Sequence, residues 1–160
     1  MMAKSHVALG LAAWIVAAPL LRLSPLDPVH LGLAAAGSLL PDVDHPKSWV
    51  GRRTRPFSSA VAAALGHRGV THSAVAVLAL VALLSHAGYR RGAVSALAVG
   101  YLAHLAADML TPRGLRLAWP LRRTWGVPLC RTGSPAESVI VAAACAATVW
   151  QVMRGLSWPG

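Results

Sequence analysis

The sequence predicts an all-α fold, a polytopic helical membrane protein with about five transmembrane or membrane-embedded helices in one bundle. Hydrophobic residues make up 56% of the chain and charged residues only 12%, whereas a soluble domain carries about twice that charge. The apolar residues also gather into five segments separated by polar loops. With 160 residues, the chain has room for a single integral-membrane domain over residues 1–160.

The five apolar segments are expected to form the helices of this bundle. They cover residues 6–23, 28–41, 72–88, 92–111 and 136–153. The first resembles a signal peptide, because Lys4 precedes an apolar stretch that contains Ala17 and Ala18. We expect it to be retained, since cleavage would remove His6 from the polar cluster described below. The second and third segments are short for a span, and residues 28–41 form either a short span or a re-entrant segment.

The charge of the loops predicts the orientation in the membrane. If all five segments cross, the amino terminus and the loops 42–71 and 112–135 lie on one side. That side then holds eleven of the 15 lysines and arginines, and the positive-inside rule makes it cytoplasmic. We therefore expect an inner-membrane protein with its amino terminus in the cytoplasm.

The net charge of +10 does not indicate a nucleic-acid partner. The basic residues lie between apolar runs and form no single helix face or aromatic-interleaved patch. Membrane lipids are the partners that this distribution favours. Cys130 and Cys145 form no CxxC motif and no disulfide framework, so we interpret both as structural.

Polar residues concentrate on the predicted cytoplasmic side, with five of the seven histidines and four of the five acids. In "GYLAHLAADMLTPRG", His104 and Asp108 are four residues apart and share one helix face. Gly100 continues that face by one turn and lets another helix approach closely. His6 and Gly10 repeat this spacing in the first segment.

Two loop motifs add further candidates on the same side. In "LPDVDH" we expect Pro41 to end the second helix, so that Asp42, Asp44 and His45 lie on an irregular turn. In "GHRGVTHS", His67 and Arg68 precede Thr71, which is a candidate N-cap of the third helix and would place His72 at the positive end of a helix dipole. A neutral ligand suits that position better than a cation.

Glu137, in "SPAE", opens the fifth segment. Serine, proline and glutamate at these positions fit a capping box with proline at the first helical position. The carboxylate is therefore either a helix cap or a further member of the polar cluster.

Neutral imidazoles and carboxylates are ligands that Zn²⁺, Mn²⁺ or Fe²⁺ prefer. The candidate ligands are His6, Asp42, Asp44, His45, His67, His72, His104 and Asp108. Eight candidates exceed the needs of one tetrahedral ion. They predict one or two divalent metal ions, most simply zinc, or one ion with outer partners and a base.

The motifs "GSLLPDVDHPKS", "GHRGVTHS" and "GYLAHLAADMLTPRGLRLAWP", in this order after His6, resemble the YdjM family of inner-membrane proteins. That family is described as LexA-binding, membrane-bound metal-dependent hydrolases. The resemblance covers residues 4–140. It implies a helical membrane protein with a metal-dependent hydrolytic site, it carries the ligand positions over onto the eight residues above, and it matches Glu137.

The leading hypothesis is a membrane-embedded metal-dependent hydrolase, with its site at the cytoplasmic interface and a lipid-linked or phosphate-containing substrate. Asp44 or Asp108 would act as base, Arg68 would bind phosphate, and Glu137 is a further catalytic candidate. A metal or ion transporter is the first alternative, which the one-sided cluster disfavours. A non-enzymatic membrane protein with a structural metal site is the second. So many carboxylates disfavour a two-histidine haem site.

Overall fold

The computed structural model describes residues 1–44, 48–53, 70–121 and 123–156. Its elements are α1 (Ala3–Leu20), α2 (Pro28–Gly37), the 3₁₀ helix η1 (Leu40–Asp44), α3 (Trp49–Arg53), α5 (Ala74–His86), α6 (Arg91–Met109) and α7 (Pro135–Leu156). The part of the chain that is described contains no β-strand, only an isolated bridge between Leu115 and Trp125. The predicted all-α fold is confirmed.

Each of the five predicted segments holds one helix of the bundle, although the lengths differ. Among the helices of the described residues, α1, α6 and α7, of 18, 19 and 22 residues, are long and apolar enough to cross a membrane. Helix α2 has 10 residues and α5 has 13, which correspond to about 15 and 20 Å at 1.5 Å per residue. Both are shorter than a hydrocarbon core of about 30 Å.

The expectation that the second helix continues to Pro41 was wrong. Helix α2 ends at Gly37, and Pro41 lies inside η1. A proline is tolerated near the start of a short helix, where its missing N–H would have no helical acceptor. Asp42 and Asp44 therefore belong to a 3₁₀ turn and not to an irregular one.

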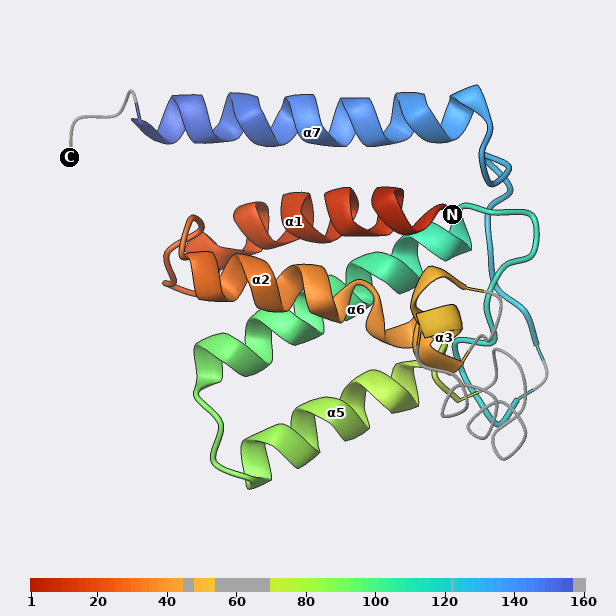
Figure 1. The fold of residues 1–160 in the computed structure, drawn as a ribbon, viewed down its shortest axis with the longest axis horizontal. Helices are drawn as coiled ribbons and strands as arrows, with labels where there is room; N and C mark the ends of the chain where they lie inside the picture. Colours follow the sequence, from red (N-terminus) through yellow and green to blue (C-terminus); the bar gives the residue numbers. More distant parts are fainter. Residues whose placement is uncertain (45–47, 54–69, 122, 157–160) are drawn as a thin grey trace.

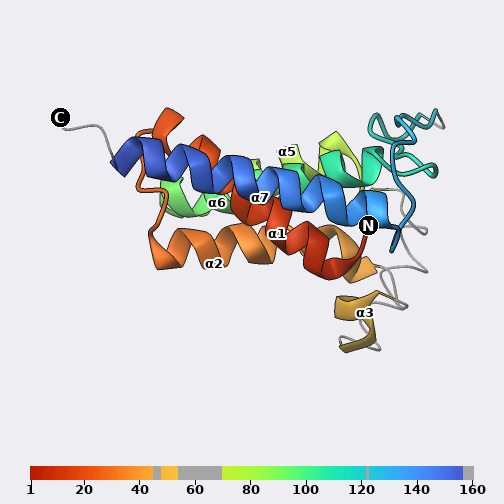
Figure 2. The same ribbon diagram turned by 90° about the horizontal axis from the view of Figure 1, so that it is seen from above.

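Helix α6 is the centre of the bundle. It packs against α1, α2 and α5, while α7 packs against α1. Figure 1 shows that consecutive helices of the bundle alternate in direction, so that the amino terminus, η1 and residues 110–121 and 123–134 lie at one end. Seen from above, α7 lies across α1, and α2 and α5 lie towards opposite edges (Figure 2). This alternation agrees with the premise of the loop-charge argument, in which consecutive segments run in opposite directions.

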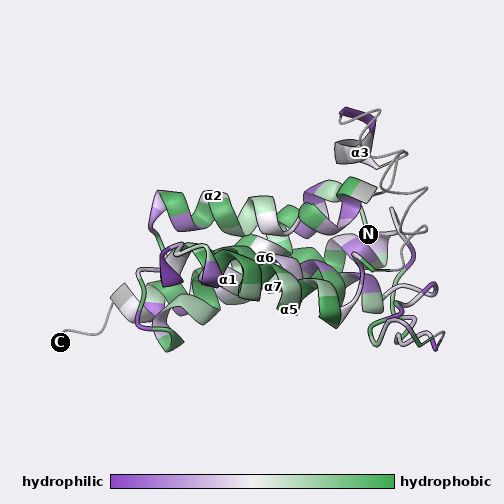
Figure 3. Cartoon of the chain, turned by 90° about the horizontal axis from the view of Figure 1, so that it is seen from below, coloured by the Kyte–Doolittle hydropathy of each residue, from purple (hydrophilic) through white to green (hydrophobic). Residues whose placement is uncertain are grey.

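Hydrophobic residues cover the helices, and hydrophilic residues concentrate in the segments at their ends (Figure 3). Trp14, Ala18, Ala34 and Ala96 form a buried cluster between α1, α2 and α6. Three of the four are alanines, which let the helix backbones approach closely.

Asp27 fixes the start of α2 at the opposite end of the bundle from η1. Its side chain accepts hydrogen bonds at 2.9 Å from the backbone N–H groups of Val29 and His30. The hydrogen bond from His30 in particular holds the pKa of this carboxyl below its usual range. Pro28 occupies the first turn, where a missing N–H costs nothing.

The predicted N-cap of the third helix was also wrong. Ser73, not Thr71, caps α5, and its hydroxyl accepts from the Ala76 N–H at 3.3 Å. The Thr71 hydroxyl lies 3.1 Å from Nδ1 of His72 instead. His72 therefore precedes the helix by two residues, in a turn held by the Tyr101 hydroxyl, which donates to the Thr71 carbonyl at 2.6 Å.

Candidate functional site

Three histidines surround Asp108 at the loop-rich end of the bundle. His6 comes from α1, His104 and Asp108 from α6, and His72 from the turn before α5. All four side chains are buried, with exposed fractions of 0–3%. The Nε2 atom of His6 lies 3.4 Å from Oδ1 of Asp108, and the Nε2 atoms of His104 and His72 lie 3.7 and 3.8 Å from Oδ2. Three imidazole nitrogens thus face one carboxylate.

Two glycines bring α2 against this cluster. A Cβ on Gly100 would overlap the carbonyl oxygen of Ala34, and a Cβ on Gly10 would lie 2.7 Å from the Cβ of Ser38. Because both positions lack a side chain, the end of α2 reaches α1 and α6. The Ser38 carbonyl then lies 2.7 Å from Nδ1 of His104.

This contact fixes the protonation pattern of the His104 ring. A carbonyl oxygen only accepts, so Nδ1 carries the hydrogen and Nε2 of the neutral ring carries a lone pair. That buried Nε2 has no hydrogen-bond partner within the described chain, and neither has the buried Nδ1 of His6. Metal-binding histidines typically donate their second nitrogen to a carbonyl or carboxylate in this way.

The donor atoms are spaced for a divalent metal. One atom each from His6, His104 and Asp108 lie within 4.8 Å of one another, and so do atoms from Asp42, His72 and His104. In a tetrahedral zinc site with bonds of about 2.0–2.1 Å, ligand atoms are about 3.4 Å apart. The His6–Asp108 distance of 3.4 Å fits this spacing. Imidazoles with carboxylates also suit zinc, manganese or iron chemically.

The amino group of Met1 is a further partner of Asp108. It lies 2.7 Å from Oδ1 and its charge compensates the buried carboxylate. Met1 and Asp108 both line a cleft beside the cluster.

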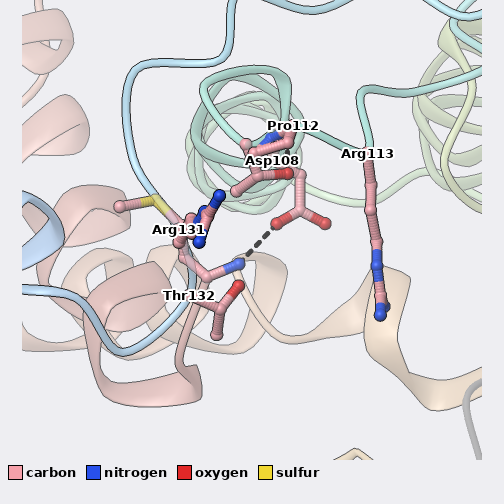
Figure 4. Close-up of a pocket in the computed structure, with 7 residues that line it drawn as sticks. Asp108, Pro112, Arg113, Arg131 and Thr132 are labelled. Carbon is pink, nitrogen blue, oxygen red and sulfur yellow. Dashed lines mark hydrogen bonds and ion pairs between the residues drawn. The ribbon is translucent and has the colours of Figure 1, made fainter.

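This cleft has a volume of about 500 Å³ and is lined by Met1, Asp108, Thr111, Pro112, Arg113, Arg131 and Thr132. In Figure 4 the side chains of Arg113 and Arg131 lie on either side of the Asp108 carboxylate. Two guanidinium groups beside a candidate metal centre form a suitable environment for a phosphate group.

Sequence reasoning assigned both arginines only to the loop charge and missed their place in the cleft. Arg113 follows closely after the end of α6. Arg131 is brought near by the preceding residues, because the N–H groups of Leu129 and Cys130 both donate to the Leu110 carbonyl at 3.0 Å. The only sequence feature that pointed to Arg113 was its position five residues after Asp108.

Glu137 is buried at the start of α7, and its carboxylate is hydrogen-bonded both to the amino-terminal segment and to the loop before α7. Its Oε1 accepts from the Met2 N–H at 2.8 Å, and its Oε2 accepts from the Gly133 N–H at 2.6 Å. The Ser134 hydroxyl accepts from the Glu137 N–H at 3.4 Å, as expected for the cap in "SPAE". Within the described residues Glu137 belongs to neither group of metal ligands.

Of the remaining candidates for the site, the structure describes the side chain of one, Asp42. Asp42 joins the second ligand group through η1. Asp44 ends η1, and its side chain lies outside the part of the chain that can be described. His45, His67 and Arg68 also lie outside the described residues.

Comparison with known proteins identifies relatives in bacterial inner membranes. Residues 1–158 match the YdjM family, described as YdjM inner membrane protein. The chain is 41% identical over 119 residues to the inner membrane protein YdjM of Escherichia coli (strain K12), a match that covers 70% of this chain and 61% of that protein. The protein of the same name from Shigella flexneri matches equally.

A second relative is the uncharacterized protein YvsG of Bacillus subtilis (strain 168). It is 31% identical over 144 residues, covering 89% of this chain and 88% of YvsG. No solved structure matches. The family match over nearly the whole chain and the apolar helices lead to one conclusion: this chain belongs to the YdjM family of inner membrane proteins.

Proposed function

We propose that this protein is a membrane-embedded metal-dependent hydrolase that acts on a phosphate-containing, lipid-linked substrate at the cytoplasmic face of the inner membrane. One observation carries the proposal: three buried histidine nitrogens face Asp108, which also lines a cleft with two arginines. The histidines and the carboxylate supply ligands, the arginines supply a site for an anion, and the cleft supplies access.

His6, His104 and Asp108 would hold the ion, since their donor atoms converge. A bound divalent metal supplies a nucleophile from water at neutral pH and polarises a phosphoryl oxygen. Arg113 and Arg131 bind and orient the phosphate by charge-assisted hydrogen bonds.

A base is also needed to accept the proton of the attacking water. Asp108, with two oxygens facing the cluster, and Asp44 are the candidates for this task. Arg68 and Glu137 remain secondary candidates, the first as a further phosphate contact and the second as a carboxylate near the amino terminus.

The cytoplasmic position of the site rests on loop charge. Eleven of the 15 lysines and arginines belong to the amino terminus and the two long loops. The helix alternation brings the amino terminus and the described parts of these loops to the end where the cluster lies. The positive-inside rule assigns that end to the cytoplasm.

The test compares two aspartates in the purified, detergent-solubilised protein. Asp108→Asn replaces the anionic carboxylate ligand with a neutral amide, whereas Asp27→Asn changes an aspartate at the opposite end of the bundle, where it caps α2. We expect Asp108→Asn to lower zinc affinity by at least about tenfold and to abolish hydrolysis of dioleoyl phosphatidic acid and p-nitrophenyl phosphate. Asp27→Asn should keep both properties.

Elemental analysis and phosphate release measure the two effects. An Asp108→Asn protein with unchanged metal content and unchanged turnover would contradict the proposed function. A wild-type protein that binds metal but hydrolyses neither phosphate ester would contradict the assigned substrate class.

A further inference from the structure

A second hollow, an apolar groove, runs along the bundle beside the site. It has a volume of about 570 Å³ and lies between α1, α6 and α7. Apart from Thr148 and Gln151, its lining residues are alanine, leucine, valine and isoleucine. The groove therefore offers a hydrocarbon surface with almost no polar partner.

The groove exists because its walls are built from small residues. Helix α6 contributes Ala103, Ala106 and Ala107, and α7 contributes Ala144 and Ala147. Larger side chains at these positions would fill the space between the helices.

Helix α7 forms the third wall of the groove, after α1 and α6. Glu137 ties the first turn of α7 to the Met2 backbone at the amino terminus of α1. Helix α7 also packs against α1, so it closes the groove as a wall.

The apolar groove and the arginine-lined cleft meet at the end of α6. Ala107 and Leu110 line the groove, whereas their sequence neighbours Asp108 and Thr111 line the cleft. The two hollows thus adjoin within about one helical turn, or about 5 Å along the axis. Because successive residues project about 100° apart on a helix, a ligand that occupies both must extend from one face of α6 to the adjacent face.

The length of the groove matches one leaflet of a bilayer. Its lining residues extend from Leu9 to Val16 on α1 and from Ile140 to Gln151 on α7, which is about 10 Å and about 16 Å at 1.5 Å per residue. Half of a hydrocarbon core is about 15 Å. A chain that enters from the leaflet at the site end would reach the bilayer midplane inside the groove.

We propose that the groove binds the acyl chain of a phosphorylated lipid, while the phosphate of that lipid lies between Arg113 and Arg131. The inference rests on the proposed function for the position of the phosphate. Lipid tails are as apolar as the groove, so chain binding there depends on van der Waals fit. The arginines select the charged end, and the groove selects the chain.

Photolabelling tests this proposal without requiring metal or turnover. The probe is phosphatidic acid with a diazirine on its acyl chain, mixed into phosphatidylcholine nanodiscs that contain the full chain. Ala106→Phe and Ala147→Phe fill the groove, and Ala82→Phe places the same ring on α5, where it is exposed and outside the groove. Peptide mapping by mass spectrometry locates the label.

We expect labels on the groove faces of α1, α6 and α7 in the wild type. The two groove variants should reduce this labelling roughly tenfold, which corresponds to about 1.4 kcal/mol of binding free energy, and Ala82→Phe should leave it unchanged. Unlabelled phosphatidic acid should compete, and it should compete more strongly than a polyprenyl phosphate. Equal competition by diacylglycerol, which has no phosphate, would overturn the proposal.

The two proposals fail in different ways. A protein that is labelled in the groove but neither binds metal nor hydrolyses phosphate esters refutes the proposed hydrolase alone. A protein that hydrolyses p-nitrophenyl phosphate but is labelled evenly on all lipid-facing helices, in the wild type and in the Phe variants alike, refutes the groove inference alone.

Discussion

Replacing Gly100 with alanine tests whether the close approach of α2 sets the geometry of the metal ligands. The added Cβ would lie 2.8 Å from the Ala34 carbonyl carbon, whereas carbon atoms pack at about 3.5–4.0 Å. Helix α2 must therefore retreat by at least about 0.7 Å. If α2 moves along the direction of the hydrogen bond between His104 and Ser38, this bond lengthens from 2.7 Å to about 3.4 Å. That length is beyond the usual limit of about 3.2 Å.

Two consequences of Gly100→Ala are measurable. Loss of the partner that orients His104 should weaken zinc binding by about 10–100-fold, measured by titration of the metal-free protein. Overpacking should lower the free energy of unfolding by about 1–3 kcal/mol. Gly32→Ala is the matched control, because a Cβ at this position on α2 meets no atom within 4 Å. Equal zinc affinity in the two variants would refute the reasoning.

Two further substitutions test the contacts that hold the site together. Glu137→Gln weakens the hydrogen bonds from the Met2 and Gly133 backbone and should lower the free energy of unfolding by about 1–3 kcal/mol in denaturant titrations; unchanged stability would show that this carboxylate does not fasten α7. Tyr101→Phe removes the hydrogen bond to the Thr71 carbonyl and should cost about 0.5–1.5 kcal/mol. It should also lower the zinc affinity, because His72 follows Thr71 and its Nε2 lies 3.8 Å from Oδ2 of the ligand Asp108. If Tyr101→Phe kept the wild-type stability and the wild-type zinc affinity, the turn before α5 would not support the metal site.

The sequence determined the helices and their alternation better than it determined their ends. The apolar segments and the long basic loops were sufficient to predict the five helices of the bundle. The choice between Thr71 and Ser73 as the cap of α5 depended on which hydroxyl faces the Ala76 N–H, and both residue types cap helices well. The early end of α2 was hidden for a similar reason, since proline is acceptable both after a helix and within a short 3₁₀ turn.

Local spacing revealed part of the site, and tertiary contacts supplied the rest. The four-residue spacing of His104 and Asp108 places both on one face of any helix. Arg113 and Arg131 lie far apart in sequence, and they line one cleft because backbone hydrogen bonds join the Leu110 carbonyl to the segment before Arg131. The groove was equally hidden, because it results from missing side-chain volume on three helices at once.

The two groups of candidate ligands share His104, and this limits the number of ions. Because its Nδ1 donates to Ser38, only Nε2 offers a lone pair, and one lone pair binds one ion. Once His104 binds with His6 and Asp108, the second group within the described chain keeps only Asp42 and His72.

Two ligands from the described residues are fewer than the three that a catalytic zinc site uses. We therefore expect elemental analysis to find one zinc ion per chain. His104→Ala should lose this ion, whereas His30→Ala should retain it, because His30 lies beside Asp27 at the opposite end of the bundle. Two ions in the wild type, or one retained ion in His104→Ala, would contradict the argument that a single nitrogen of His104 anchors the site.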